Sequence, residues 1–99
     1  MNQPIERVTV YAKKDEGTDP CPYCEKAKSW LAERDIPYRL VEMTQEERQG
    51  FYDRMELVGR ERTVPQVMVQ DIMGDWHRIG GYAELQNSRL ETLFQENIS

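Results

Sequence analysis

The order of strand and helix patterns in the first part of the chain restricts its possible folds more than any other feature. Residues 5–11 (IERVTVY) are rich in β-branched and aromatic side chains, so they predict a strand. Residues 37–43 (PYRLVEM) predict a second strand by partial alternation. Residues 24–34, between them, predict a helix with one apolar face formed by Ala27, Trp30 and Leu31. Such a crossover makes the two strands parallel and the connection right-handed.

The second half of the chain predicts a helix, a hairpin and a closing helix. Thr44 and Glu47 have the spacing of a capping box, so we expect a helix from there to about Val58, ended by Gly59. Residues 64–70 and 76–80 predict two antiparallel strands joined by a turn at Gly74 and Asp75. The closing helix is expected over residues 82–95 with four apolar side chains facing inward: Leu85, Leu90, Leu93 and Phe94.

These elements predict an α/β fold with the order βαβαββα. The parallel pair and the final hairpin combine into a mixed four-stranded sheet with helices on both faces. A chain of 99 residues has material for one hydrophobic core, so we expect a single domain over residues 1–99.

Charge and hydropathy restrict the partners and the compartment. The net charge of -5 argues against nucleic acid, whose phosphates require a basic face. Residues 1–14 do not read as a secretory signal, and no apolar run is long enough to predict a membrane span. We therefore expect a cytoplasmic monomer with no membrane partner, in a compartment where structural disulfides are rare.

Cys21 and Cys24 form a C-x-x-C pair between the first predicted strand and the predicted helix. A cysteine at a helix start faces unpaired backbone N–H groups, which favour its thiolate. We expect Cys21 to be the nucleophile and Cys24, one turn further along, to be the thiol that resolves a mixed disulfide. Asp19 would oppose the Cys21 thiolate and nearby lysines would favour it, and the sequence does not decide between them.

A zinc site is the main alternative for such a pair. A structural zinc ion takes four ligands, whereas the chain has no second cysteine pair and one histidine, His77. We therefore predict no metal site and interpret His77 as a strand residue that faces solvent or packs at an edge.

Three motifs in register make the resemblance to a known family specific. CPYC (21–24), TVPQV (63–67) and IGGYAEL (79–85) resemble the motifs of dithiol glutaredoxins, which have the thioredoxin-like fold. The resemblance implies a glutathione-dependent thiol-disulfide oxidoreductase that reduces protein disulfides and glutathione mixed disulfides. It also implies glutathione as co-substrate, disulfide-containing proteins as partners, and ribonucleotide reductase as one candidate among them.

The same resemblance implies which residues bind glutathione. A cis Pro65 would let the Val64 backbone, in the segment that begins with Thr63, pair with the tripeptide as an added strand. Gly80 and Gly81 would allow close approach at the start of the last helix, where backbone N–H groups of Tyr82 and Ala83 would hold the γ-glutamyl carboxylate. The remaining implied contacts come from Tyr23 beside the sulfur and from cations near the glycyl carboxylate: Lys13 or Lys14, with Arg60 or Arg62.

Two departures from the family pattern leave different functions open. Ala83 and Glu84 stand where many members have a hydroxyl or acidic residue followed by Asp, and the loop before Cys21 is longer than usual. The chain could therefore be a glutathione-independent redoxin served by a thioredoxin-reductase-type enzyme. Two further functions involve no catalysis: that of a metal or iron-sulfur carrier, and that of a thioredoxin-fold subunit that modulates a larger partner.

Overall fold

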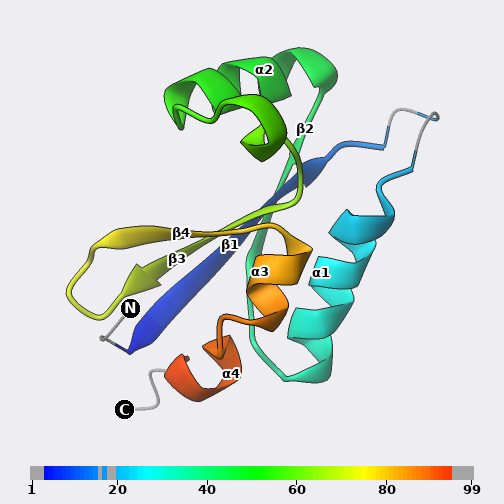
Figure 1. Cartoon of the computed structure of the whole chain (residues 1–99). Helices are drawn as coiled ribbons and strands as arrows, with labels where there is room; N and C mark the ends of the chain where they lie inside the picture. The colour runs from blue at the N-terminus through cyan, green and yellow to red at the C-terminus, as the bar shows by residue number, and fades with distance from the viewer. Residues whose placement is uncertain (1–3, 16, 18–19, 95–99) are drawn as a thin grey trace.

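The elements follow one another in an order close to the predicted one (Figure 1). The computed structural model describes residues 4–15, 17 and 20–94. Its strands are β1 (Ile5–Lys13), β2 (Arg39–Met43), β3 (Gln66–Asp71) and β4 (Trp76–Gly80). Its helices are α1 (Pro22–Glu33), α2 (Gln45–Arg54), the 3-10 turn η1 (Gly59–Glu61), α3 (Tyr82–Gln86) and α4 (Leu90–Leu93). None of the described helices is both long and apolar enough to cross a bilayer.

The four strands form one mixed sheet in the order β2-β1-β3-β4, as predicted. β1 and β2 are parallel, with Thr9 opposite Arg39 and Lys13 opposite Met43. β3 lies antiparallel to both β1 and β4. The chain leaves the carboxyl end of β1 at Lys13 and next reaches the segment that carries the cysteines.

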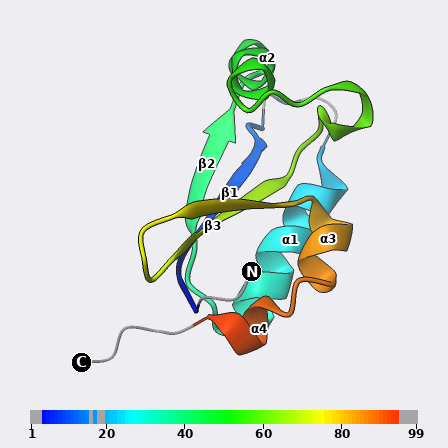
Figure 2. The ribbon, with the colours of Figure 1, turned by 60° about the vertical axis from the view of Figure 1, so that its left-hand side comes forward.

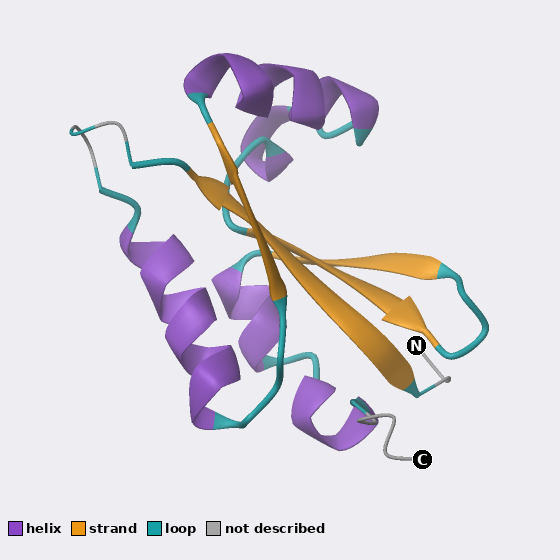
Figure 3. Cartoon of the chain, turned by 180° about the vertical axis from the view of Figure 1, so that it is seen from behind, coloured by secondary structure: helices purple, strands orange, loops and turns teal. Residues whose placement is uncertain are grey.

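Helices cover both faces of the sheet, which confirms the predicted architecture. Figure 2 shows α1 and α3 side by side against one face, and Figure 3 shows α2 apart from them at one end of the sheet. Alternation along β1 serves both faces: Val8 and Val10 enter the larger core under α1 and α3, whereas Tyr11 packs against the α2 cluster of Met43, Phe51, Tyr52 and Leu57.

The cysteine helix begins at Pro22, just before the apolar pattern of residues 24–34. Pro22 occupies its first turn, where a missing N–H costs no hydrogen bond. The predicted apolar face is buried, including Trp30 and Leu31. α1 then ends in a Schellman motif: Asp35 adopts a left-handed φ of 55°, and Ile36 N–H bonds back to the Leu31 carbonyl.

α2 ends at Arg54, so the prediction that it reaches Val58 and stops at Gly59 is wrong. Glu56 takes the left-handed conformation with φ 56°, and Leu57 N–H bonds to the Tyr52 carbonyl. This Schellman motif buries Leu57 beneath α2, whereas Val58 is 70% exposed. Gly59, with φ 58°, begins the 3-10 turn instead of ending the helix.

The predicted closing helix is two short helices, and the break has a physical reason. Leu85 and Leu90 are both fully buried, although residues five apart point in directions about 140° apart on a continuous helix. Arg89, at φ 57°, turns the chain between them. Ser88 Oγ donates to the Leu85 carbonyl (2.6 Å) and accepts from Leu90 N–H (3.2 Å), which satisfies the broken helix ends. As predicted, Leu93 and Phe94 pack on the core; residue 95 lies outside the described chain.

Candidate active site

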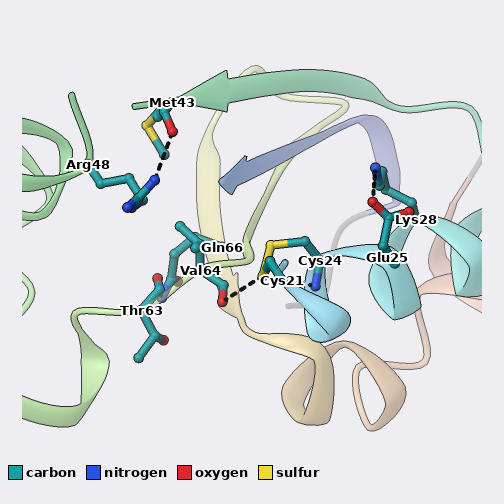
Figure 4. The surroundings of a disulfide bond; sticks show 9 residues. All are labelled: Cys21, Cys24, Glu25, Lys28, Met43, Arg48, Thr63, Val64 and Gln66. Atoms are coloured by element: carbon teal, nitrogen blue, oxygen red, sulfur yellow. Dashed lines mark hydrogen bonds and ion pairs between the residues drawn. A yellow bond between two sulfur atoms is a disulfide. The ribbon is translucent and has the colours of Figure 1, made fainter. Parts of the chain in front are cut away.

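Cys21 and Cys24 are joined by a disulfide at the start of α1 (Figure 4). Cys21 is the N-cap residue, and its Sγ accepts a hydrogen bond from Cys24 N–H at 3.3 Å. Cys24 is 2% exposed, whereas Cys21 is only half-buried. The structure thus places the Cys21 sulfur against a backbone donor and closer to solvent, and Cys24 one turn deeper, as predicted.

Val64 lies opposite the Cys21 sulfur. Its carbonyl oxygen is 3.8 Å from Cys21 Sγ (Figure 4), and the Val64–Pro65 peptide bond is cis, as the family resemblance implied. β3 starts at Gln66, so the prediction that this strand begins at residue 64 is wrong. Among the described residues, neither the N–H nor the C=O of Val64 pairs with another backbone group. Within this part of the chain, Val64 therefore offers an unpaired backbone edge beside the Cys21 sulfur.

The glycine pair lies next to this edge. A Cβ atom on Gly81 would stand 3.6 Å from the Pro65 carbonyl oxygen, which shows how near the two segments run. Gly80 has φ +117°, and a Cβ there would meet the Glu84 side chain at 2.9 Å, so this position requires glycine. Gly81 N–H donates to Glu84 Oε1 at 3.3 Å, so the chain's own carboxylate already binds one donor at the start of α3.

Aromatic and apolar groups border the same edge. Tyr23, 59% exposed, lies with its ring centroid 6.5 Å from that of Tyr82, and Lys26 Nζ is 5.2 Å from the centroid of the Tyr23 ring. Ala83 is exposed, and so is Thr63 beside Val64. The structure thus brings the segments that carry Val64, Gly81, Tyr82 and Tyr23 close to Cys21.

Lysines approach Cys21 from the end of β1. A cleft of about 440 Å³ is lined by both cysteines and by Lys13, Lys14 and Lys28. It also contains carboxylates, and one of them, Glu25, accepts a 2.8 Å bond from Lys28 that raises the pKa of the lysine. The long loop therefore leaves Lys13 and Lys14 at the site; Asp19, the residue expected to oppose them, lies outside the described residues.

Of the two arginines considered for the glycyl carboxylate, Arg62 already binds other groups of the chain. Its guanidinium bonds Asp53, Gln49 and the Leu57 carbonyl and lies 5.2 Å from the centroid of the Tyr52 ring. These contacts tie Arg62 to the end of α2. Arg60 is exposed on η1 and remains a candidate.

Two polar residues near the site were not predicted from the sequence. Arg48 of α2 donates to the Met43 carbonyl at 3.0 Å, and Gln66 is 2% exposed behind Val64 (Figure 4). Alternation along residues 64–70 places Gln66 on the same face as Met68, but it does not reveal that the amide is buried and fully bonded. His77, in β4, bonds Asp71 Oδ2 at 2.8 Å and so belongs to the hairpin. Within the described ranges, no group of three or more His, Cys, Asp or Glu side chains is placed to hold a metal ion.

Comparisons with known proteins agree on one family. A model of the glutaredoxin family matches residues 8–72. Glutaredoxin 1 of Rickettsia typhi is 33% identical over 82 residues, covering 76% of this chain and 71% of that protein. Glutaredoxin 1 of Rickettsia felis is 40% identical over 55 residues, so the match spans about half of each chain: 52% of this one and 51% of the relative.

Solved structures show the same relationship. The crystal structure of glutaredoxin 1 from Francisella tularensis complexed with cacodylate is 30% identical, covers 88% of this chain and 95% of its own, and has a TM-score of 0.66. A second solved structure, named "Metal Binding of Glutaredoxins", is 25% identical with a TM-score of 0.51 and covers 96% of this chain. The fold is therefore the thioredoxin-like fold of these proteins, with the C-x-x-C pair at the start of its first helix. The chain belongs to the glutaredoxin family, whose members are thiol-disulfide oxidoreductases.

Proposed function

We propose that this protein is a glutathione-dependent thiol-disulfide oxidoreductase in which Cys21 attacks and Cys24 resolves. The observation that carries the proposal is the position of Cys21: its sulfur caps α1, receives Cys24 N–H, and faces the unpaired backbone of Val64 in the described chain. This arrangement supplies both a stabilised thiolate and a place for the peptide chain of a disulfide substrate.

The reaction is an exchange of two electrons between sulfur pairs. In the reduced protein, the Cys21 thiolate attacks one sulfur of a substrate disulfide, and the other sulfur leaves as a thiolate that takes up a proton. Cys24, after losing its proton, attacks Cys21 and releases the second substrate thiol. The product is the Cys21–Cys24 disulfide that the structure contains. Two glutathione molecules then restore the dithiol. The thiolate of the first attacks Cys21, which forms a mixed disulfide and frees Cys24 as a thiol. The second attacks the glutathione sulfur of that mixed disulfide, which frees the Cys21 thiol and produces oxidised glutathione.

We infer the glutathione contacts from the groups around Cys21. Val64, with Thr63 and Pro65 beside it, would pair with the tripeptide backbone, and Tyr23 would lie over its cysteine. Lys13 would meet the glycyl carboxylate. Gly81, Tyr82 and Ala83 would lie at the γ-glutamyl end. The proximity of these segments to Cys21 supports the assignment.

The test separates the two cysteines. Cys21→Ser should abolish reduction of both protein disulfides and glutathione mixed disulfides. Cys24→Ser should retain part of the activity on glutathione mixed disulfides, because that reaction needs only the attacking sulfur. Rates would be followed through NADPH consumption with glutathione and glutathione reductase. Equal loss in both variants would contradict the division of roles.

A second candidate is a redoxin reduced by a thioredoxin-reductase-type enzyme. Ala83 favours it, because its methyl side chain cannot make the polar contact that a hydroxyl or acidic side chain makes at this position in many family members. Comparing glutathione plus glutathione reductase with thioredoxin reductase as electron source distinguishes the two. If turnover is faster with thioredoxin reductase than with glutathione and glutathione reductase, the primary proposal is wrong and this second function is supported.

We also propose a cytoplasmic location and disulfide-containing protein substrates, with ribonucleotide reductase as one candidate. The glutathione pool of the cytosol is kept reducing, so the proposed chemistry can be sustained there.

A further inference from the structure

A buried amide lies directly behind the segment that faces Cys21. Gln66 is 2% exposed, and its Nε2 donates to two backbone carbonyls of the preceding loop, those of Glu61 (3.1 Å) and Thr63 (3.0 Å). Both donors of this side-chain amide are therefore satisfied by one short stretch of chain. Figure 4 shows Gln66 beside Thr63 and Val64, with Val64 directed at Cys21.

Arg78 completes the arrangement from the neighbouring strand. Its Nη1 donates to Gln66 Oε1 at 3.3 Å, and its Nη2 bonds Glu61 Oε2 at 3.0 Å. The arginine thus holds the side chain of Gln66 and the side chain of Glu61 at once. We call these three residues, Glu61, Gln66 and Arg78, the loop clamp. Every polar atom of the Gln66 amide has a partner, so the network can hold one arrangement.

Val64 packs against both hydrophobic clusters, but within the described chain its segment has few hydrogen bonds to the sheet. Val64 and Pro65 precede β3, and Val64 makes no backbone pair within the described chain. The backbone hydrogen bonds donated by Glu61, Arg62 and Thr63 stay within residues 58–63. Within the described chain, the Gln66 side chain therefore ties the carbonyls of Glu61 and Thr63, which precede Val64, to the start of β3.

We propose that Gln66 and Arg78 are positioning residues that set the place of the Val64 backbone opposite Cys21, and thereby the affinity for the peptide part of a disulfide substrate. The inference rests on the proposed function, because the clamp matters to turnover only if Val64 binds substrate backbone. Neither residue reaches Cys21 by any hydrogen bond of the described chain, so we expect the clamp to act on substrate binding and not on the reactivity of the sulfur.

The decisive variant is Gln66→Leu, and the chain offers a matched control. Gln70 lies on the same strand and the same face, and its Nε2 donates to the Gly74 carbonyl at 2.9 Å in the hairpin turn. Gln70→Leu also deletes an amide from β3, but it leaves residues 61–65 untouched. Arg78→Met is the second variant; its side chain is about one-third exposed (34%), so it keeps the test usable if Gln66→Leu does not fold.

Three quantities are measured for each variant: KM and kcat for a glutathionylated peptide, the same for a disulfide-linked peptide with dithiothreitol as reductant, and the rate at which iodoacetamide alkylates Cys21. We expect Gln66→Leu to raise KM about tenfold for both substrates, because a misplaced binding edge weakens binding. Its kcat and alkylation rate should stay within about twofold of the unaltered protein. Arg78→Met should raise KM by a smaller factor, since Gln66 keeps its two carbonyl partners.

The proposal is overturned if Gln66→Leu and Gln70→Leu have equal KM values, or if the alkylation rate falls together with activity. If Gln66→Leu does not fold, unchanged KM values in Arg78→Met overturn it. The dithiothreitol arm separates this outcome from failure of the proposed function. An unaltered protein that reduces the disulfide-linked peptide but not the glutathionylated one would refute glutathione dependence, and the clamp would still be judged on the peptide that is reduced.

Discussion

Glu84 Oε1 accepts a hydrogen bond from Gly81 N–H at 3.3 Å, across the start of α3 and next to the segment that faces Cys21. The side chain that departs from the family pattern thus turns back onto a backbone donor. A glutathione molecule bound in the proposed orientation would bring its γ-glutamyl end toward this negative charge, and the ammonium group of that end could pair with it.

Removing that charge should therefore weaken glutathione binding, because the γ-glutamyl ammonium loses an ionic partner. We expect Glu84→Gln to raise the KM for a glutathionylated peptide about two- to fivefold, the effect typical of losing one exposed ion pair. Glu91→Gln, which removes an exposed acid from α4, serves as the control and should leave KM unchanged. A decrease in KM for Glu84→Gln would show that the carboxylate opposes binding instead.

The two thiols of the reduced protein should react at very different rates. Cys21 is half-buried and capped by a backbone donor, whereas Cys24 is 2% exposed. A short pulse of iodoacetamide at neutral pH should label Cys21 alone, as judged by peptide mass. Labelling of Cys24 first, or of both at equal rates, would contradict the assignment of the nucleophile.

The hairpin between β3 and β4 should become less stable in acid. The hydrogen bond with His77, together with N–H donors of Asp75 and Met73, lowers the pKa of Asp71. A lowered pKa in the folded state means that the ionised carboxylate stabilises the fold above the unfolded-state pKa of about 3.9, and that this stabilisation disappears as the pH falls through the lower folded value.

Asp71→Asn tests this linkage. We expect a lower Tm than that of the unaltered protein at pH 7, and a difference that shrinks as the pH is lowered below about 4. Thermal unfolding followed by circular dichroism at several pH values gives both quantities. Asp75→Asn, in the same turn, is the control, because the side chain of Asp75 makes none of these three bonds.

Both long helices end with an acidic residue in the left-handed conformation, Asp35 after α1 and Glu56 after α2. Glycine adopts this conformation without steric cost, so Asp35→Gly and Glu56→Gly should each raise the free energy of unfolding by about 0.5–1 kcal/mol. Urea denaturation measures the change. Ala32→Gly, inside α1, should lower stability by about 1 kcal/mol instead, and a loss in all three variants would contradict this account of the helix ends.

The sequence predicted features that depend on local pattern and chain order. The alternation in residues 5–11, the capping box of Thr44 and Glu47 and the C-x-x-C pair each appear in the structure where the pattern placed them. The helix ends that the sequence did not predict depend on which side chains the tertiary structure buries. Leu57 ends α2 early because it is buried, and Leu85 and Leu90 can both face the core only if the closing helix breaks.

The loop clamp shows the same limit for the site. The motif TVPQV indicates the segment that faces Cys21, but a glutamine in a strand pattern gives no sign of its partners. Only the fold brings the arginine of β4 within 3.3 Å of that amide. Polar side chains that act through neighbouring groups are hidden from a single sequence because their bonding partners lie far along the chain.

The hydrogen bond from Cys24 N–H to Cys21 Sγ exists while the two sulfurs are still bonded to each other. The amide is thus already directed at the sulfur that carries the negative charge in the proposed mechanism. Reduction of the disulfide therefore needs no reorientation of the peptide group at the helix start. The free energy needed to orient that dipole is spent when the chain folds and not during each reaction.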